Sequence, residues 1–206
     1  MKFRMIEKLC KEQGVVYLYD EDQVDDEDQV DDEVRPRQWM GDGFAIYPLD
    51  GMPYLYEDGV AAIFDLSGKK REEMIFKYKT ELPSGICLDD TDREEIQLEQ
   101  YNMRLTVDGH ELVMLRGCDD RLVCILRKYL SPFEKNDEIE LFRRVTEQGN
   151  VFVAVKIGCI LRGVISEYMP TNERFVETLG SIYNAAAVAL SREKGEAEQL
   201  KAKLDG

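Results

Sequence analysis

The stretch VFVAVKIGCILRGVIS, residues 151–166, is the most apolar part of the 206-residue chain. It is rich in β-branched residues, which favour strands, and Gly158 interrupts it where a hairpin would turn. We predict two strands, at about 150–156 and 159–166. Because nearly every side chain from Val151 to Val155 is apolar, both faces must be covered, so this hairpin is expected at the centre of a sheet.

Two further blocks upstream of this hairpin show strand patterns. The run EIELFRRV, residues 138–145, alternates and predicts a third strand. Its two faces are expected to carry Ile139, Leu141, Arg143 and Val145 on one side and Glu138, Glu140, Phe142 and Arg144 on the other. Residues 95–126 predict a three-strand meander with turns at Asp108-Gly109 and at 117–120, and such short loops join antiparallel neighbours.

The N-terminal part predicts a mixture of short elements. The expected order is a helix at 2–13 ended by Gly14, a strand at 15–19, a hairpin of 43–49 and 52–56 turning at Asp50-Gly51, a helix from 59 to 74 interrupted at Ser67-Gly68, and a strand at 75–79. The predicted fold class is therefore α+β, with largely antiparallel sheet built from hairpins and meanders, helices on one face and a long C-terminal helix.

That C-terminal helix is expected to begin at Thr171 or Asn172. Its apolar stripe consists of Phe175, Leu179, Ile182, Tyr183, Ala186 and Leu190. Beyond residue 190 the pattern turns polar, and Leu200 and Leu204 continue only a weak seam. We expect this charged extension either to fray or to pair with a second copy, so one hypothesis is a homodimer through Leu200 and Leu204.

The negative charge of the chain is concentrated in one segment. The formal net charge is −15, yet residues 20–33 hold ten acids and no base, so the other 192 residues carry only −5. The segment contains a tandem hexad, DQVDDE at 22–27 and again at 28–33. Like charges at this density repel any compact state, which predicts an extended loop lengthened by duplication. No register supplies the glycine and the oxygen ligands of a calcium loop.

The acidic segment also predicts a strip for a basic partner, because spaced carboxylates attract cationic side chains. The carboxylates that would carry this contact are Asp25, Asp26, Glu27, Asp31, Asp32 and Glu33. The expected organisation is a helix and strand at 1–19, an acidic low-complexity loop at 20–37, an α+β domain at 38–190 and a charged helical tail at 191–206. The α+β domain is either one body or two sheet-plus-helix lobes, at about 38–131 and 132–190.

No set of residues in the sequence predicts catalysis. His110 is the sole histidine, and a nucleophile role for Cys118 or Cys159 beside it would need a local signature that the chain lacks. The five cysteines are odd in number, and none has the spacing of a metal knuckle. We therefore predict no catalytic, metal or cofactor site. A reducing cytoplasm is the expected compartment, and the apolar stretches are too short for a membrane span, which needs about twenty residues.

Two classes of function remain. The favoured hypothesis is a non-catalytic cytoplasmic interaction or regulatory module, which binds a basic protein partner through the acidic segment or associates through the C-terminal extension. The alternative is a nucleic-acid-associated accessory protein. It is either a sliding-clamp-like ring subunit, by analogy with the recurring sheet-plus-helix layout, or an acidic mimic of DNA, since spaced carboxylates resemble a nucleic-acid backbone in charge density. Direct binding of nucleic acid is expected only for the ring subunit.

Overall fold

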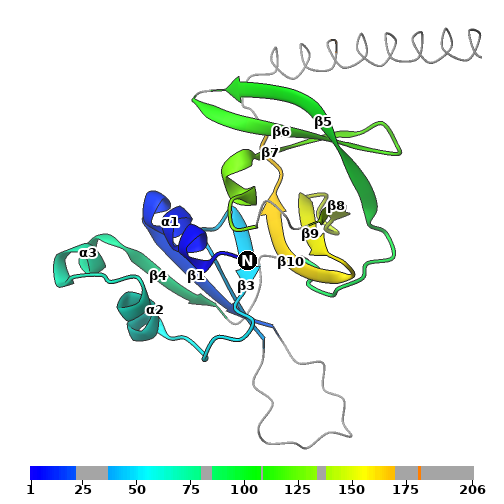
Figure 1. Ribbon diagram of the computed structural model, residues 1–206. Helices are drawn as coiled ribbons and strands as arrows, with labels where there is room; N and C mark the ends of the chain where they lie inside the picture. Colours follow the sequence, from blue (N-terminus) through cyan, green and yellow to red (C-terminus); the bar gives the residue numbers. More distant parts are fainter. Residues whose placement is uncertain (22–36, 80–84, 108, 134–137, 170–180, 182–206) are drawn as a thin grey trace, which may run out of the picture. The chain divides into compact units, whose positions relative to one another are not determined.

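The computed structural model describes residues 1–21, 37–79, 85–107, 109–133, 138–169 and 181. The chain divides into two compact units, residues 1–168 and 169–206, and nearly all described residues belong to the first (Figure 1). The predicted long C-terminal helix, with Leu200 and Leu204, lies outside the described residues. No helix of the described part is long and apolar enough to cross a membrane.

The first unit is a mixed α/β structure built on one ten-stranded sheet. Its helices are α1 (Phe3–Gln13), α2 (Glu57–Ile63), α3 (Gly68–Glu73) and the 3-10 helix η1 (Arg127–Leu130). Its strands are β1 (Val15–Asp20), β2 (Gln38–Gly41), β3 (Ala45–Pro48), β4 (Ile75–Lys79), β5 (Ile96–Val107), β6 (His110–Gly117), β7 (Leu122–Leu126), β8 (Ile139–Val145), β9 (Val151–Ile157) and β10 (Ile160–Ser166). The strand order is β4-β1-β2-β3-β10-β9-β8-β5-β6-β7. Every neighbouring pair is antiparallel except β1 and β4, which are parallel.

The apolar hairpin β9-β10 occupies the middle of this order, as predicted. Val153, Ala154 and Val155 are completely buried. The side chains of Val153 and Val155 belong to one hydrophobic cluster, and that of Ala154 belongs to a second. Because successive side chains of a strand point to opposite faces, the two clusters lie on the two faces of the sheet, and both are covered.

The first cluster lies beneath α1 and α2. Ile6, Leu9 and Cys10 of α1 are buried in it, together with Val60 of α2 and Phe64, the C-cap of α2. Gly14 ends α1 in the left-handed conformation, at φ 70°, as its position predicted. The helix therefore turns directly into β1.

On the opposite face, the second cluster is covered by a loop, and none of its described members belongs to a helix. Leu88, from the segment between β4 and β5, is buried there against Trp39, Ile46, Leu161 and Val164. Two side-chain contacts hold this loop in place: Asp90 accepts a hydrogen bond of 2.8 Å from the backbone N–H of Leu161, and Arg144 binds two of the loop's carbonyl groups.

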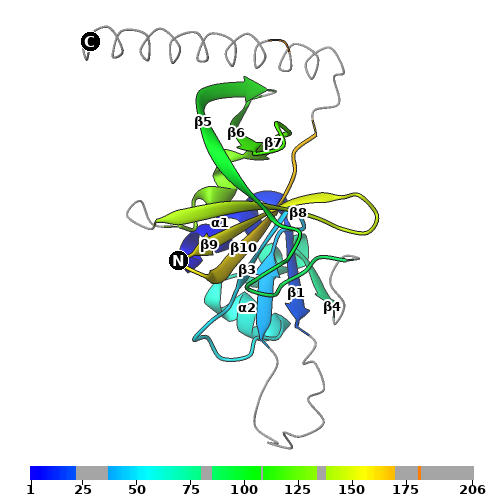
Figure 2. The same cartoon turned by 90° about the vertical axis from the view of Figure 1, so that its right-hand side faces the viewer.

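The second half of the sheet curls over. Figure 2 shows β5 arching away from β8 towards β6 and β7. The backbone N–H of Tyr168, just after β10, donates to the carbonyl of Cys124 in β7 at 2.7 Å. This contact joins the end of the β10 segment to the last strand of the order. Side chains of β6 and β7 such as Leu115 and Ile125 consequently share the first cluster with Val153 and Val155.

Most predicted strands are confirmed, but the hairpin predicted at Asp50-Gly51 is wrong. β3 turns back to β2 through residues 42–44 and pairs on its other side with β10. Residues 52–56 form no strand. The Gln38 side chain instead satisfies both backbone groups of Leu55: its Oε1 accepts from the N–H at 2.9 Å, and its Nε2 donates to the carbonyl at 3.0 Å. The Gln38 side-chain amide thus supplies the two backbone hydrogen bonds of Leu55 that a neighbouring strand would have supplied.

Candidate protein-interaction surface

The acidic segment begins at the end of β1 and is followed by the start of β2, and we call this pair of strand ends the neck. Asp20, at the end of β1, pairs with Gln38 at the start of β2. One residue further out, the N–H of Glu21 donates to the carbonyl of Arg37 at 2.8 Å. Glu21 and Arg37, the described residues on either side of residues 22–36, are therefore held side by side by β1 and β2.

Two tyrosine hydroxyl groups converge on the first acid of the segment. Tyr54, from the loop after β3, and Tyr78, from β4, both donate hydrogen bonds to Oδ2 of Asp20, and their hydroxyl oxygens contact each other. The Gln38 amide donates to Oδ1 of the same carboxylate at 3.3 Å. Partial burial, and then the bond to Asp20, raises the pKa of both tyrosines, so both keep their protons at neutral pH.

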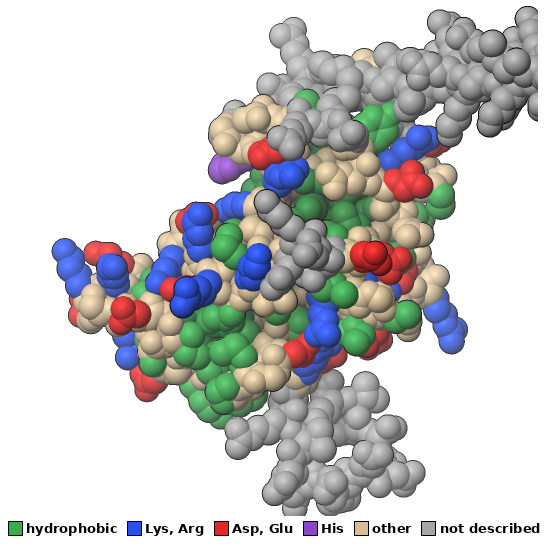
Figure 3. Space-filling view, in the orientation of Figure 1, with side chains coloured by type: hydrophobic (Ala, Val, Ile, Leu, Met, Phe, Trp, Pro, Cys, Tyr) green, Lys and Arg blue, Asp and Glu red, His purple; other side chains and the backbone are tan. Residues whose placement is uncertain are grey.

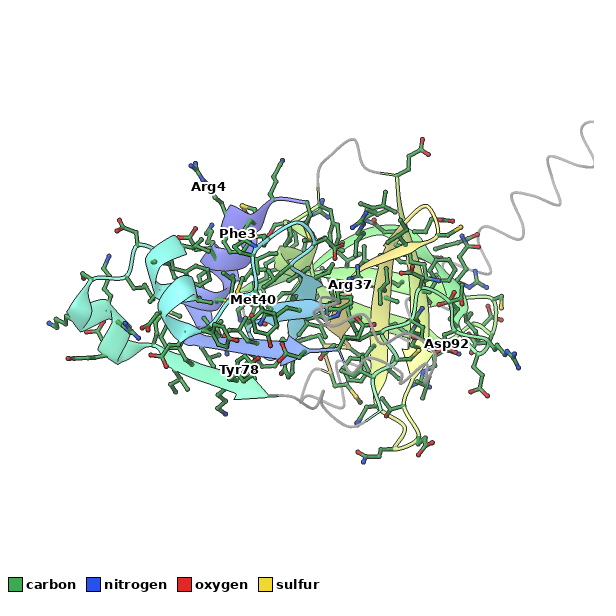
Figure 4. The ribbon with its side chains drawn as sticks, turned by 90° about the horizontal axis from the view of Figure 1, so that it is seen from below. Phe3, Arg4, Arg37, Met40, Tyr78 and Asp92 are labelled. Atoms are coloured by element: carbon green, nitrogen blue, oxygen red, sulfur yellow. The ribbon has the colours of Figure 1, made fainter. Side chains whose placement is uncertain are left out.

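A third tyrosine extends this group into solvent. The Tyr56 ring lies 5.1 Å from that of Tyr54 and stacks on that of Tyr78 at 6.2 Å between centroids. Tyr56 is 64% exposed and Tyr78 46% exposed. We call Tyr54, Tyr56 and Tyr78 the tyrosine cluster. Figure 4 shows Tyr78 on β4, well away from Arg4 on α1.

Two cations, Arg37 and Arg162, share the carboxylate of Asp50 on the other side of the neck. Arg37 donates to Asp50 at 2.8 and 3.0 Å, and its guanidinium lies 4.8 Å from the centre of the Trp39 ring. Arg162 also donates to Asp50, at 2.6 Å, and the indole N–H of Trp39 donates to Glu21 at 2.9 Å. The hydrogen bond from Arg37 lowers the pKa of Asp50. One carboxylate offsets only one of these two positive charges.

The residues first considered for catalysis lie apart. His110 is exposed at the start of β6, and Cys118 follows the far end of the same strand, roughly 26 Å away at an extended rise of about 3.3 Å per residue. Cys159 lies in the turn between β9 and β10. Within the described part of the chain, no group of three or more histidine, cysteine or acidic side chains is placed to hold a metal ion.

The sequence-predicted contact residues are not part of this geometry. Asp25, Asp26, Glu27, Asp31, Asp32 and Glu33, and also Leu200 and Leu204, lie outside the described residues. The tyrosine cluster itself was missed. The sequence pattern predicts Tyr54 and Tyr56 in a hairpin strand. Nothing local indicates that Tyr78 joins them, because β4 reaches β1 only through a parallel pairing.

Fold and surface together define a mixed α/β protein with one large, mainly antiparallel sheet, in which an acidic insertion begins beside an exposed tyrosine cluster. Comparison of the chain with protein-family models, with curated proteins and with solved structures finds no match.

Proposed function

We propose that this protein is a non-catalytic interaction module that binds a basic segment of a partner protein at the tyrosine cluster. The observation that carries the proposal is the convergence of Tyr54 and Tyr78 on Asp20, with Tyr56 stacked beside them in solvent. Exposed aromatic side chains thereby stand where the segment with most of the chain's negative charge begins.

The chemistry of the cluster suits arginine and lysine side chains. A guanidinium or ammonium group over a tyrosine face gains about 0.5–1 kcal/mol at an exposed site and about 2 kcal/mol when desolvated. Tyrosine supplies a rigid contact area at low entropic cost. Asp20 holds the hydroxyl groups of Tyr54 and Tyr78, so those two rings are already oriented before a partner arrives.

The acidic segment supplies the long-range part of the recognition. Its ten acids attract a basic partner and raise the rate of encounter. Salt weakens this attraction, which falls off over a distance of about 10 Å at moderate ionic strength. Stacking on the tyrosine rings is a short-range contact that salt screens much less. The acidic charge therefore speeds the encounter with the basic partner, and the tyrosine rings retain the partner once it is bound.

The test uses labelled arginine-rich, lysine-rich and glutamate-rich peptides of matched length, with binding followed by fluorescence anisotropy at low and high salt. We expect the basic peptides to bind, and Tyr56→Ala to weaken the arginine-rich peptide by about 1–2 kcal/mol, roughly 5- to 30-fold, with most of this loss surviving at high salt. Phe44→Ala is the matched control, since Phe44 is an exposed aromatic in the β2-β3 turn, outside the cluster.

A second variant separates charge from stacking. It replaces all six predicted acids by their amides, as Asp25→Asn, Asp26→Asn, Glu27→Gln, Asp31→Asn, Asp32→Asn and Glu33→Gln. Binding at low salt should fall and the salt dependence should flatten, while the Tyr56→Ala effect persists. Equal losses in Tyr56→Ala and Phe44→Ala would refute the assignment to the tyrosine cluster, and no preference for basic over glutamate-rich peptide would refute the function.

The DNA-mimic hypothesis makes a different prediction for the same variants. A mimic that acts through charge density alone would lose binding on neutralisation of the acids and would be indifferent to Tyr56→Ala. The sliding-clamp hypothesis and the homodimer through Leu200 and Leu204 stay predictions.

A further inference from the structure

A cleft with inverted charge lies away from the tyrosine cluster. Its volume is about 800 Å³, within the range of small-molecule sites. Its walls come from the start of α1, from β5, from Gly109 and the start of β6, from the end of β7, from η1 with its flanking residues, and from the start of β8. The lining residues are Lys2, Met5, Gln100, Gly109, His110, Glu111, Leu126, Arg127, Lys128, Leu130, Ser131, Phe133 and Ile139.

The ionisable side chains among the described lining residues are mainly basic, although the chain as a whole carries −15. Among the described residues that line the cleft, Glu111 is the one acid, and it pairs with Arg127 at 3.4 Å. Lys2 and Lys128 form no ion pair with any residue that the structure describes, and the Lys128 ammonium lies 5.0 Å from the centre of the Tyr129 ring. Figure 3 shows Lys and Arg side chains between His110, in purple, and the surface over α1.

The helix α1 adds to this positive potential. Lys2 is its N-cap, no side chain caps its first N–H groups, and its first turn contains no acid. Helix N-termini carry a partial positive charge, which an acid in the first turn would otherwise offset. Lys2 and Met5, which bracket this end of the helix, both line the cleft.

The floor of the cleft is apolar. Leu126, Leu130 and Ile139 are partly buried and pack against the first hydrophobic cluster, and Phe133 belongs to that cluster. An inorganic anion would leave this floor exposed to water, whereas a ligand with a hydrocarbon body would cover it and gain about 25 cal/mol for each Å² of apolar area buried.

We propose that this cleft binds a small organic anion with an apolar body. The anionic head lies between the Lys2 and Lys128 ammonium groups, and the apolar body lies on Leu130, Ile139 and Met5. Carboxylate and phosphate heads share this chemistry. The site is independent of the basic-partner function, because none of its lining residues belongs to the tyrosine cluster.

The sole histidine provides a direct readout. His110 lines the cleft, so its ring signals in the proton–nitrogen NMR spectrum of the full chain report occupancy without ambiguity. The probes are octanoate, octyl phosphate, octanol, octylammonium and inorganic phosphate, with the charged amphiphiles kept below their micellar concentrations and octanol below its solubility limit. We expect octanoate and octyl phosphate to shift the His110 signals saturably, and both to bind at least tenfold more tightly than octanol, octylammonium or inorganic phosphate.

Variants test the assigned residues. Lys2→Gln and Lys128→Gln should each weaken octanoate about 5- to 10-fold, whereas Lys69→Gln, on the exposed surface of α3, should leave the affinity unchanged. Octanol binding as well as octanoate, or equal affinities in all three variants, would overturn the proposal. An acidic peptide that shifts His110 where octanoate does not would replace the small anion with a protein partner.

Discussion

Arg144 offers the sharpest test of how the loop between β4 and β5 is held. The side chain is almost completely buried in β8. Its Nε and Nη2 donate to Glu95 at 3.0 and 2.7 Å, and its Nη1 donates to the carbonyl groups of Cys87 and Asp89 at 2.9 and 2.8 Å. Lys156 of β9 donates to the other oxygen of Glu95. Arg144→Met keeps most of the volume and removes all four of its bonds.

The expected loss of stability follows from these contacts. Removing one partner of a buried ion pair costs about 3–5 kcal/mol, because the remaining charge stays desolvated. Two carbonyl groups also lose their donor, at about 1–3 kcal/mol each where water cannot reach them. Lys156 still pairs with Glu95, which reduces the total. We therefore expect Arg144→Met to lower the free energy of unfolding by about 3–5 kcal/mol.

Equilibrium unfolding in urea with linear extrapolation measures this loss. Arg162→Met is the matched control, since its ion pair with Asp50 is about one-third exposed and such pairs contribute about 0–1 kcal/mol. In the double variant Arg144→Met with Lys156→Met, Glu95 loses both cations, so the cost should exceed the sum of the single effects. An Arg144→Met loss below about 1 kcal/mol, equal to the control, would refute the claim that this network holds the loop.

Three further predictions concern the sheet and its pH dependence. Val153→Asp should lower the free energy of unfolding by more than about 3 kcal/mol, since the side chain has no exposure; near-wild-type stability in urea would contradict a covered central strand. Gly41→Ala should lower the free energy of unfolding several times more than Gly51→Ala, because a Cβ at Gly41 would lie 1.7 Å from the Ala45 carbonyl oxygen. A Cβ at Gly51 meets nothing within 4 Å and costs only the strain of a positive φ, about 1–2 kcal/mol. Equal unfolding midpoints for the two variants would refute this prediction. Burial raises the pKa of Glu167, so its contribution to stability is complete below the ordinary value of about 4.3 and is lost as pH rises through the raised value. Glu167→Gln should therefore gain stability relative to wild type between acid and neutral pH, and a constant difference across that range would exclude the effect.

Local patterns in the sequence determined most of the secondary structure. Gly14 ends α1 where predicted, the strand pattern at 75–79 became β4, and the apolar stretch at 151–166 became the central hairpin. These features depend on residues within a few positions of one another, through turn conformation and the two-residue period of a strand. The clustering of acids at 20–33 is likewise a property of the sequence alone.

The pairing of distant segments came only from the tertiary structure. Tyr78 reaches Asp20 because β4 lies parallel to β1. Arg144 meets Glu95 because β8 pairs with β5 in a register that sets Arg143 against Ile96. The same limit explains the wrong hairpin at Asp50-Gly51, where a local turn motif was overridden by pairing of β3 with β2 and β10. Strand order is set by which apolar faces can be buried together, a property of the whole sheet that no short window of sequence contains.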